Sequence, residues 1–546
     1  MNISFVGAAK TVTGSCYHIK TDTCSFLVDC GMFQGNNALE AQNHEPFPFN
    51  PAELDFMLLT HAHIDHSGRI PKLFVDGFKG QIYATKATAE LCSLMLPDSG
   101  HIQEFENEWV NRKRERAGLP PVQPLYTSQD AIDSIRLFSS VRYSEEVRIN
   151  DQIRARFNDA GHILGSSIVE IWVKENDKEV KLVFSGDLGN MNMPILRDPS
   201  IIDSADYLFI ESTYGNRNHL NVENKIDRFI EIITSTMAKG GNIIIPSFAV
   251  GRTQEILYQL FKQREKYGDK INQLLRIPVY VDSPLAVSAT KVFRNNLDCF
   301  DEEAREYIEN GDNPLDFPGL QFTQSVEDSK ALNEREESLI IISASGMCDA
   351  GRIKHHLKHN LWRKESSIVF VGYQAEGTLG RRLVDGADKV RIFGEEISVN
   401  ARVEMIEGFS GHADKDGLIN WLKAFEQKPK KIFIVHGEED SMNEFSELIA
   451  NELRVGTIIP GRGDSYTVTY AGVTGMEKRA ALEEKKEKYG FKRLEIVYML
   501  DKLKEELEEA SAIIRDDLGT EKEDMELEEL VQKLHKFEKN IIDIIK

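Results

Sequence analysis

Short apolar runs separated by polar or glycine-containing turns dominate the first 211 residues. Such runs predict β-strands, here over 24–28, 55–60, 81–84, 181–184 and 207–210. Four of the strands run into acidic residues or histidines, which are Asp29, the cluster beginning at His61, Asp187 and Glu211. Because loops on a rigid scaffold usually carry functional groups, this pattern predicts a site along one sheet edge.

Longer alternating units of helix and strand follow residue 211. In order, they are a helix over 224–238, a strand over 242–246, a helix from about residue 253, and strands over 278–281, 339–342 and 368–371. Strands that alternate with helices predict a parallel α/β sheet. Short β-rich runs return over 390–406, and a helix over 415–425 and a strand over 431–435 then lead to His436. The pattern therefore predicts one domain interrupted by another.

The tail from about residue 477 has a helical pattern. Its apolar residues recur every three or four positions, as Ile496, Leu500, Leu503, Leu507, Ala510 and Ile514 and again as Leu527, Leu530, Leu534, Phe537 and Ile541. Between the two runs, Gly519 can end one helix while Thr520 and Glu523 form a capping box that begins the next. The pattern predicts a helical hairpin, which either packs on its own body or forms a homodimer seam.

Composition and charge narrow the class of protein. A length of 546 residues predicts roughly three to four compact units at about 150 residues each. The net charge of −22 argues against a basic surface that coats nucleic acid, so a polyanionic ligand needs a local basic cleft or metal ions. The six cysteines form no CxxC pair and suit buried small residues. Without an apolar run of roughly 18 residues or a signal-peptide pattern, we expect a cytoplasmic protein with no membrane partner.

The segment HAHIDH, residues 61–66, carries the strongest chemical signal in the chain. In an extended chain the side chains of His61 and His63 can face one point. A turn can then direct Asp65 and His66 toward a second point, while Thr60 is interpreted as a strand-end residue. Imidazole and carboxylate together suit zinc better than an oxygen-seeking ion such as calcium. The pattern therefore predicts a metal site rather than solvated histidines.

Zinc completes a shell of about four ligands, so the cluster needs ligands from elsewhere in the chain. His162 in NDAGHILGS, Asp187 in FSGD and His436 in FIVHGEED follow apolar runs or lie in glycine-flanked turns. Asp187 is the natural candidate to bridge two ions. The predicted sets are His61, His63, His162 and Asp187 at one ion, and Asp65, His66, Asp187 and His436 at the other.

Three turns offer groups that suit a phosphate chain. PSFAVGRTQE places Ser247 and Arg252 at a strand-to-helix turn, where backbone N–H groups and a guanidinium suit an anion. Ser343 and Ser345 lie in the small-residue turn SASGM, and Ser410 lies in GFSGHAD. We predict substrate contacts at these five residues, although each turn can equally be structural.

A second histidine cluster lies between residues 355 and 359. His355, His356 and His359 occupy positions i, i+1 and i+4 of a predicted helix, which imitates a metal site. The sequence shows no evident acidic partner for them. We therefore interpret them as surface histidines.

HAHIDH with later histidine and aspartate ligands resembles the metallo-β-lactamase fold, and ESTYG, GFSGHAD and IVHGEE resemble motifs A, B and C of its β-CASP branch. This branch includes the endonuclease subunit of the cleavage and polyadenylation factor, its archaeal and bacterial relatives, and RNase J. The resemblance covers about residues 1–470. It implies an α/β chain with an αββα sandwich over 1–211 and 396–472 and an inserted β-CASP α/β domain over 212–395. The helical hairpin predicted from apolar spacing, over 477–546, lies outside the resemblance.

The resemblance also implies roles for single residues. Asp29 in VDCGMFQG matches the first motif, which supports the metal shell. Glu211 matches motif A and His412 matches motif B, which pair near the leaving group. His436 matches motif C, which is histidine in RNA-processing members and typically valine in DNA-repair members such as Artemis. The match therefore favours RNA as substrate, with Asp65, Glu211 and His412 as the expected catalytic residues.

The expected reaction is hydrolysis of phosphodiester bonds in single-stranded RNA, mainly at internal positions. Two zinc ions, with Mn²⁺ as the alternative, would hold a hydroxide that attacks phosphorus in line. His412, oriented by Glu211, would protonate the departing 3′ oxygen, which leaves 5′-phosphate and 3′-hydroxyl ends. The sequence leaves three alternatives open, which are a 5′→3′ exoribonuclease, a small-molecule ester or thioester hydrolase of the same superfamily, and a non-catalytic RNA-binding subunit.

Overall fold

The computed structural model describes residues 1–478 except 176–177, 220–224, 273–276, 376, 407 and 409. From residue 479 onward the predicted C-terminal hairpin lies outside the described residues, so it stays a prediction. The described chain contains two sheets that share a core, a third sheet of parallel strands, and a two-stranded hairpin.

The first two sheets lie face to face and enclose an apolar core. The first sheet has the order β23-β22-β1-β2-β3-β4-β5-β6, with bounds β1 Asn2–Phe5, β2 Tyr17–Lys20, β3 Ser25–Val28, β4 Phe56–Leu58, β5 Gln81–Thr85, β6 Phe138–Val141, β22 Asp464–Thr469 and β23 Gly472–Lys478. The second has the order β21-β20-β11-β10-β9-β8-β7, with bounds β7 Glu146–Arg148, β8 Ile153–Asp159, β9 Ser167–Glu175, β10 Lys178–Phe184, β11 Tyr207–Ile210, β20 Lys431–Ile434 and β21 Thr457–Ile458.

Aromatic rings fill the space between these sheets. Phe184 is the last residue of β10, and Phe209 and Phe433 are next to last in the neighbouring strands β11 and β20. The ring of Phe209 stacks on that of Phe184, with centroids 4.2 Å apart, and on that of Phe433, with centroids 4.8 Å apart. Phe5 of the first sheet places its ring 5.5 Å from that of Phe433. Burying each such ring contributes about 1.5–3 kcal/mol, so this layer joins the two sheets firmly.

Helices cover the outer faces of both sheets. Apolar residues of α13 and α14 pack on the second sheet, and those of α3, α4 and α5 pack on the first. The order helix, sheet, sheet, helix confirms the predicted αββα sandwich. The helices of this part are α1 Asn37–Ala41, α2 Ile64–Ser67, α3 Ile70–Val75, α4 Lys86–Arg116, α5 Ser128–Ser134, α13 Lys415–Lys423 and α14 Glu439–Leu453.

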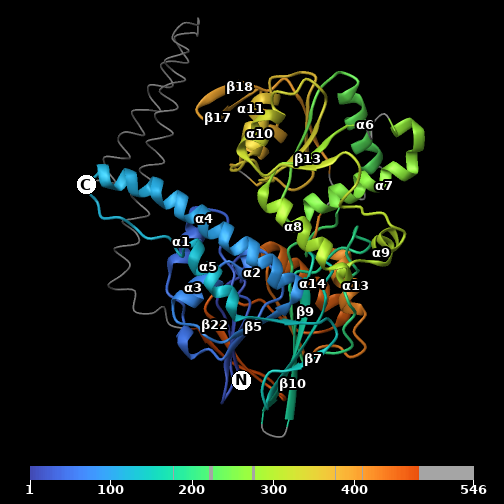
Figure 1. Cartoon of the computed structure of the whole chain (residues 1–546). Helices are drawn as coiled ribbons and strands as arrows, with labels where there is room; N and C mark the ends of the chain where they lie inside the picture. The colour runs from blue at the N-terminus through green and yellow to red at the C-terminus, as the bar shows by residue number, and fades with distance from the viewer. Residues whose placement is uncertain are drawn as a thin grey trace, which may run out of the picture. The chain divides into compact units, whose positions relative to one another are not determined.

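Segments from both ends of the described chain meet inside each sheet. β1 pairs antiparallel with β22, and β11 pairs parallel with β20. In Figure 1 the blue N-terminal strands and the orange-red strands near residue 470 accordingly lie side by side. The chain between them forms the third sheet, as the interruption in the pattern predicted.

The third sheet has the order β14-β13-β15-β12-β16-β19, and all its pairings are parallel, which confirms the prediction. β19 pairs with β16 and so extends this sheet past the predicted boundary at residue 395. The strands are β12 Ile243–Pro246, β13 Val279–Val281, β14 Leu320–Phe322, β15 Ile340–Ser343, β16 Ser367–Phe370 and β19 Arg402–Met405, with the separate hairpin of β17 Lys389–Ile392 and β18 Glu395–Ser398. The helices are α6 Lys225–Met237, α7 Arg252–Asn272, α8 Pro284–Asn295, α9 Glu302–Glu309, α10 Val326–Leu332, α11 Ile353–Asn360 and α12 Leu379–Val384.

The long helix α4 was not predicted from the sequence. It begins at an N-cap, Thr85, whose side chain accepts a hydrogen bond from the backbone N–H of Thr88. Leu91 and Leu96 are buried in the first half, whereas Phe105 and Trp109 in the second half are 70% and 55% exposed. The helix as a whole is only weakly amphipathic, so hydrophobic periodicity gave no signal for it.

His356 is a core residue, so its interpretation as a surface histidine is wrong. Its side chain is fully buried, and its Nε2 lies 2.6 Å from Oδ2 of Asp282. The acidic partner is 74 residues away in the chain and becomes a neighbour only through the parallel sheet. His355 and His359 are exposed, as predicted.

The Asp282 carboxylate is the centre of this buried network. It accepts hydrogen bonds from the hydroxyls of Ser329, at 2.5 Å, and Thr323, and from Arg352 at 2.7 Å. Burial alone would raise the pKa of Asp282, but these donors and His356 lower it well below its ordinary value. Asp282 is therefore charged, and it ties the carboxyl end of β13 to α10 and α11.

Two further predictions concern the cysteines and the possibility of membrane-spanning helices. All six cysteines are unpaired and buried, as predicted. Among the described residues, every helix falls short of what a membrane crossing requires in length or apolar character.

Replacing Asp282 with Asn should destabilise the protein. Removing one partner of a buried ion pair costs about 3 kcal/mol, because Arg352 then loses its counter-charge and His356 loses its carboxylate partner. Urea unfolding followed by intrinsic fluorescence measures this loss. The matched control is Asp316→Asn, because Asp316 is 58% exposed and pairs with Arg294 at the surface, where an ion pair contributes little. Equal stability of the two variants would show that the network does not support the fold.

Candidate metal centre

The HAHIDH segment leaves the first sheet at the carboxyl end of β4. The backbone stays extended as far as His63, whose φ and ψ are −54° and 145°, and α2 begins at the next residue. The first turn of α2 therefore redirects Asp65 and His66, as predicted. Backbone packing at Gly31 fixes this turn, because a Cβ there would lie only 1.6 Å from the carbonyl oxygen of Asp65.

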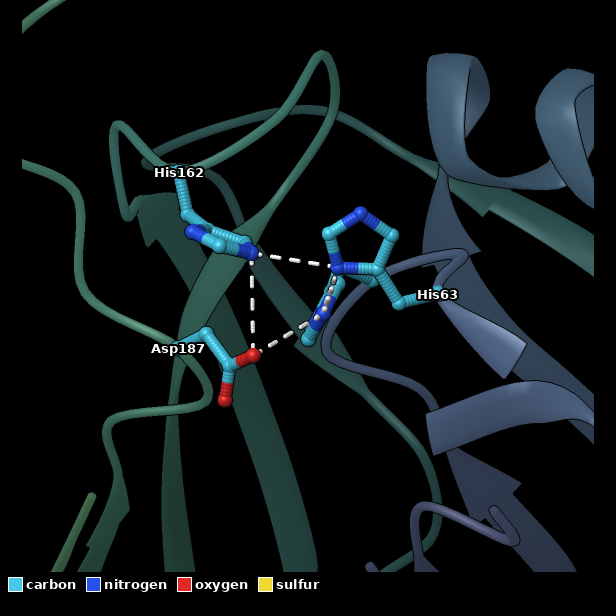
Figure 2. A group of neighbouring side chains, drawn as sticks. His63, His162 and Asp187 are labelled. Atoms are coloured by element: carbon cyan, nitrogen blue, oxygen red, sulfur yellow. Dashed lines mark hydrogen bonds and ion pairs between the residues drawn. The ribbon is translucent and has the colours of Figure 1, made fainter. Parts of the chain in front are cut away.

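The first predicted ligand set is brought together. Nδ1 of His63 lies 3.2 Å from Nε2 of His61 and 3.1 Å from Nε2 of His162. Oδ2 of Asp187 lies 3.4 Å from Nε2 of His61 and 3.6 Å from Nε2 of His162. Figure 2 shows His63, His162 and Asp187 turned toward one another from separate segments of the chain.

The second predicted ligand set lies on the other side of the same carboxylate. Oδ1 of Asp187 lies 3.2 Å from Nε2 of His66 and 3.6 Å from Nε2 of His436. Oδ2 of Asp65 lies 3.3 Å from Nε2 of His436 and 3.9 Å from Nε2 of His66. Asp187 therefore presents one oxygen to each set.

Both sets fit a metal cation. Ligand atoms on a tetrahedron with bonds of about 2.0–2.1 Å are about 3.3 Å apart, which is close to the separations in the first set. Oδ1 of Asp187 accepts no hydrogen bond from the described residues although it is buried. A buried carboxylate oxygen without a donor is costly unless a cation compensates it. The cluster can therefore bind metal.

Residues outside the two sets fix which nitrogen each histidine presents. Nδ1 of His162 lies 2.9 Å from the carbonyl oxygen of Gly411, which can only accept, so this nitrogen carries the proton. Nδ1 of His66 likewise donates to Oδ2 of Asp29 at 2.7 Å. In the neutral form of each ring, Nε2 then directs its lone pair at the centre. Such outer partners orient metal ligands and are part of the site.

Thr60 is one of these partners, and its interpretation as a plain strand-end residue is incomplete. Its backbone N–H and its hydroxyl donate to the two oxygens of Asp29, at 2.8 and 2.9 Å. Its hydroxyl oxygen also lies 3.1 Å from Nδ1 of His61. Thr213 holds His436 in the same way, with 3.1 Å between its Oγ1 and Nδ1 of His436. The sequence offered one indication of these two roles. Thr60 directly precedes His61, and Thr213 follows Glu211 by two residues.

The histidines of the two ligand sets differ in how readily they bind a proton. Burial lowers the pKa of His61 to about 3, and it also lowers the pKa of His162 well below its ordinary value. Burial also opposes charge on His66, but the nearby Asp187 and Asp29 outweigh it and raise the pKa of His66 well above its ordinary value. Neutral imidazole is the form that binds metal, so the first set is ready for an ion, while an ion at the second must displace a proton.

His412 and Glu211 form a pair next to Asp187. Nδ1 of His412 lies 3.2 and 3.3 Å from the two carboxylate oxygens of Glu211, which is fully buried. Burial would lower the pKa of His412, but Glu211 and Asp187 outweigh it and raise this pKa to about 9. Because Nδ1 faces Glu211, Nε2 is the nitrogen that can exchange a proton with a substrate.

Three loops that carry these residues are joined through their backbones. Gly189 forms a β-bridge with His412, and its N–H donates to the carbonyl oxygen of Ala160 at 2.8 Å. A Cβ on Gly189 would lie 1.9 Å from the carbonyl oxygen of Gly161, so only glycine fits there. The loops carrying Asp187, His162 and His412 therefore keep fixed relative positions.

The inserted parallel sheet reaches this centre with the carboxyl ends of its strands. Gly251 lies in the turn after β12 and is close to Ile163, the residue that directly follows His162. A Cβ added to Gly251 would lie 3.7 Å from the side chain of Ile163. β19 ends at Met405, and the chain then leads to His412. Clefts at the carboxyl ends of parallel strands are the usual binding sites of such sheets.

The five predicted substrate-contact residues divide into two groups. Ser247 and Ser343 are buried, and the hydroxyl of Ser343 donates to the carbonyl oxygen of Asp282 at 2.8 Å. The hydroxyl of Ser247 lies 3.1 Å from that of Thr253. The second group, Arg252, Ser345 and Ser410, is half-buried. Within it, Arg252 pairs with Glu255 at the start of α7.

Three family models match successive parts of the chain. Residues 9–130 match the metallo-beta-lactamase superfamily, residues 253–383 match the Beta-Casp domain, and residues 396–460 match the Zn-dependent metallo-hydrolase RNA specificity domain. The matches follow the order of the sandwich, the inserted sheet and the return to the sandwich.

Curated relatives match over most of their length. Ribonuclease TTHA0252 of Thermus thermophilus is 38% identical over 450 residues, which cover 82% of this chain and 96% of the relative. An RNase J-like protein of Methanocaldococcus jannaschii is 30% identical, over 84% of this chain and 98% of the relative. Transcription termination factor FttA of the same organism is 31% identical, over 86% of this chain and 72% of the relative. This chain therefore belongs to the β-CASP family of the metallo-β-lactamase superfamily.

Proposed function

We propose that this protein is a metal-dependent ribonuclease that hydrolyses single-stranded RNA, mainly at internal phosphodiester bonds, in the cytoplasm. The observation that carries the proposal is the pair of ligand sets that share Asp187, with His412 and Glu211 beside them. RNA as the substrate is supported by the match of residues 396–460 to the RNA specificity domain and by a 38% identical relative named as a ribonuclease.

We assign two zinc ions to the centre, with Mn²⁺ as the alternative. One ion would be held by His61, His63, His162 and Asp187, and the other by Asp65, His66, Asp187 and His436. The five imidazole ligands of the two sets favour zinc over hard, oxygen-seeking ions. Asp29 and Thr60 would hold the ligand rings in place from outside.

The reaction then divides between the ions and the chain. When bound, two ions would supply an activated water and would neutralise charge on the phosphate oxygens. Asp65 is the most exposed carboxylate of the sets, at 17%, which suits it to accept a proton from the attacking water. His412, held by Glu211, protonates the departing 3′ oxygen through Nε2. The products carry 5′-phosphate and 3′-hydroxyl ends.

Contacts to the RNA backbone come from the half-buried group of turn residues. Arg252, Ser345 and Ser410 lie at or near the surface of the turns that face the centre. A guanidinium is a strong phosphate ligand, so Arg252 is the principal contact. The hydroxyls of Ser247 and Ser343 are engaged inside the fold, so these two residues shape the turns rather than bind substrate.

Digestion of defined RNAs tests the proposed function. We expect internal fragments from an unstructured RNA whether its 5′ end carries a monophosphate or a triphosphate, and little cleavage of duplex RNA or DNA. A chelator should abolish cleavage, and zinc or manganese should restore it. Mononucleotides from the 5′-monophosphate RNA alone would favour the exonuclease, and binding without cleavage would favour a non-catalytic subunit. Hydrolysis of a thioester without action on RNA would favour the small-molecule hydrolase.

Metal content should respond differently to three substitutions. His162→Ala and His436→Ala should each reduce two ions per chain to about one, because each removes a ligand from a different set of about four. Asp187→Asn should lower the occupancy of both ions, because its carboxylate faces both sets. Elemental analysis of the purified variants gives the stoichiometry, with the exposed His359→Ala as control. Full metal content in Asp187→Asn would contradict the shared-ligand assignment.

His412→Ala should slow cleavage without removing metal. Loss of a general acid typically costs about 10²- to 10⁴-fold in rate, and we expect this fall in kcat at unchanged metal content. An RNA with a 3′-bridging sulfur as leaving group needs no protonation, so it should be cleaved almost equally by the variant and the original protein. If His412→Ala loses metal instead, His412 is a ligand of the ions.

A further inference from the structure

Two aromatic side chains lie exposed at the carboxyl edge of the inserted sheet. Phe248, in the turn after β12, is 49% exposed, and Tyr373, in the turn after β16, is 57% exposed. β12 and β16 are hydrogen-bonded neighbours, so the two turns are adjacent. A single exposed aromatic residue is ordinary on a protein surface, whereas a pair at one sheet edge beside a reaction centre needs an explanation.

The backbone beneath Phe248 is held in place. Its carbonyl oxygen accepts a hydrogen bond from the hydroxyl of Thr253 at 2.7 Å, in the first turn of α7. Its ring lies against Gly346, where a Cβ would be 3.3 Å from two ring atoms. Glycine at this position therefore lets the turn after β15 form the support of the ring.

The turn that carries Tyr373 is joined to the same support. The buried side chain of Gln374 donates from Nε2 to the carbonyl oxygens of Gly346 and Gly372, both at 3.1 Å, and of Tyr373, at 3.2 Å. Both aromatic residues therefore stand on backbone that is fixed around Gly346. Rings on fixed backbone lose little conformational freedom when they bind a ligand.

This edge also faces the metal centre. Gly251 follows Phe248 by three residues and lies against Ile163, the neighbour of His162. A strand of RNA that reaches the centre through the carboxyl edge therefore passes Phe248 and Tyr373. With a net charge of −22, the chain as a whole does not attract a polyanion, so local contacts must supply the affinity.

We propose that Phe248 and Tyr373 form a stacking platform for unpaired bases of the RNA substrate, next to the bond that is cleaved. The inference rests on the proposed function and adds to it the part of the substrate that is bound. Every base has a π-face, so stacking is tolerant of sequence. Bases inside a duplex are already stacked and paired, so the platform selects single strands.

Kinetics of Phe248→Ala and Tyr373→Ala test the platform. We expect each variant to raise KM for an unstructured RNA by about tenfold, with kcat changed by less than about threefold. Phe248→Trp and Tyr373→Phe keep a ring and should keep KM. The matched control is Trp362→Ala, because Trp362 is 57% exposed but lies in the turn before β16, at the opposite edge of the same sheet. Metal content and melting temperature identify any variant that has misfolded.

RNAs with one abasic nucleotide locate the contact. Moving the abasic position along the RNA should reveal one or two positions where KM rises about tenfold with the original protein. At those positions Phe248→Ala or Tyr373→Ala should add no further loss, because the interaction is already absent. Equal abasic effects in all proteins, a fall in kcat alone, or a KM within twofold of the original would overturn the platform.

Failure of the platform and failure of the proposed function give different results. If the original protein cleaves single-stranded RNA but both alanine variants match Trp362→Ala, only the platform is wrong. If the original protein neither binds nor cleaves RNA, the platform and the proposed function are both wrong.

Discussion

The Asp187 carboxylate is the interaction on which the arrangement of the site depends. It is 2% exposed, carries negative charge, and has imidazole nitrogens on both sides at 3.2–3.6 Å. An isolated buried carboxylate would be strongly unfavourable, and burial by itself would raise its pKa. The charges of His436 and His66 instead lower the pKa of Asp187 well below its ordinary value. The centre therefore collects cations, whether protons on imidazole or metal ions, around one fixed anion.

The fold provides this arrangement through strand ends. Asp29 follows β3 and His61 follows β4, which are parallel neighbours in the first sheet. Asp187, Glu211 and His436 follow β10, β11 and β20, which are parallel neighbours in the second. Parallel neighbours end at the same edge, so residues hundreds of positions apart meet without long connections. The stacked rings between the sheets then hold the two edges against each other.

How much was predictable depends on the kind of information each residue carries. The histidines and aspartates that meet around Asp187 could be predicted because the HxHxDH spacing after an apolar strand is distinctive, and the family motifs added Glu211 and His412. Thr60 could not be assigned, because a threonine at a strand end is common and its contacts with Asp29 and His61 arise only after folding. His356 was misread for the same reason, since nothing in the sequence points to Asp282 as its partner. The sheet was predicted from periodicity, but α4 was not, because its amphipathic pattern is weak.

An acidic protein that acts on a polyanion must concentrate positive charge at its binding site. The overall charge of −22 repels phosphate at long range, so the positive potential has to be local. Under the proposed function, metal ions held at the Asp187 centre and the Arg252 guanidinium would supply it at short range, where a nearby phosphate is little affected by screening. The aromatic edge adds affinity that does not depend on charge at all.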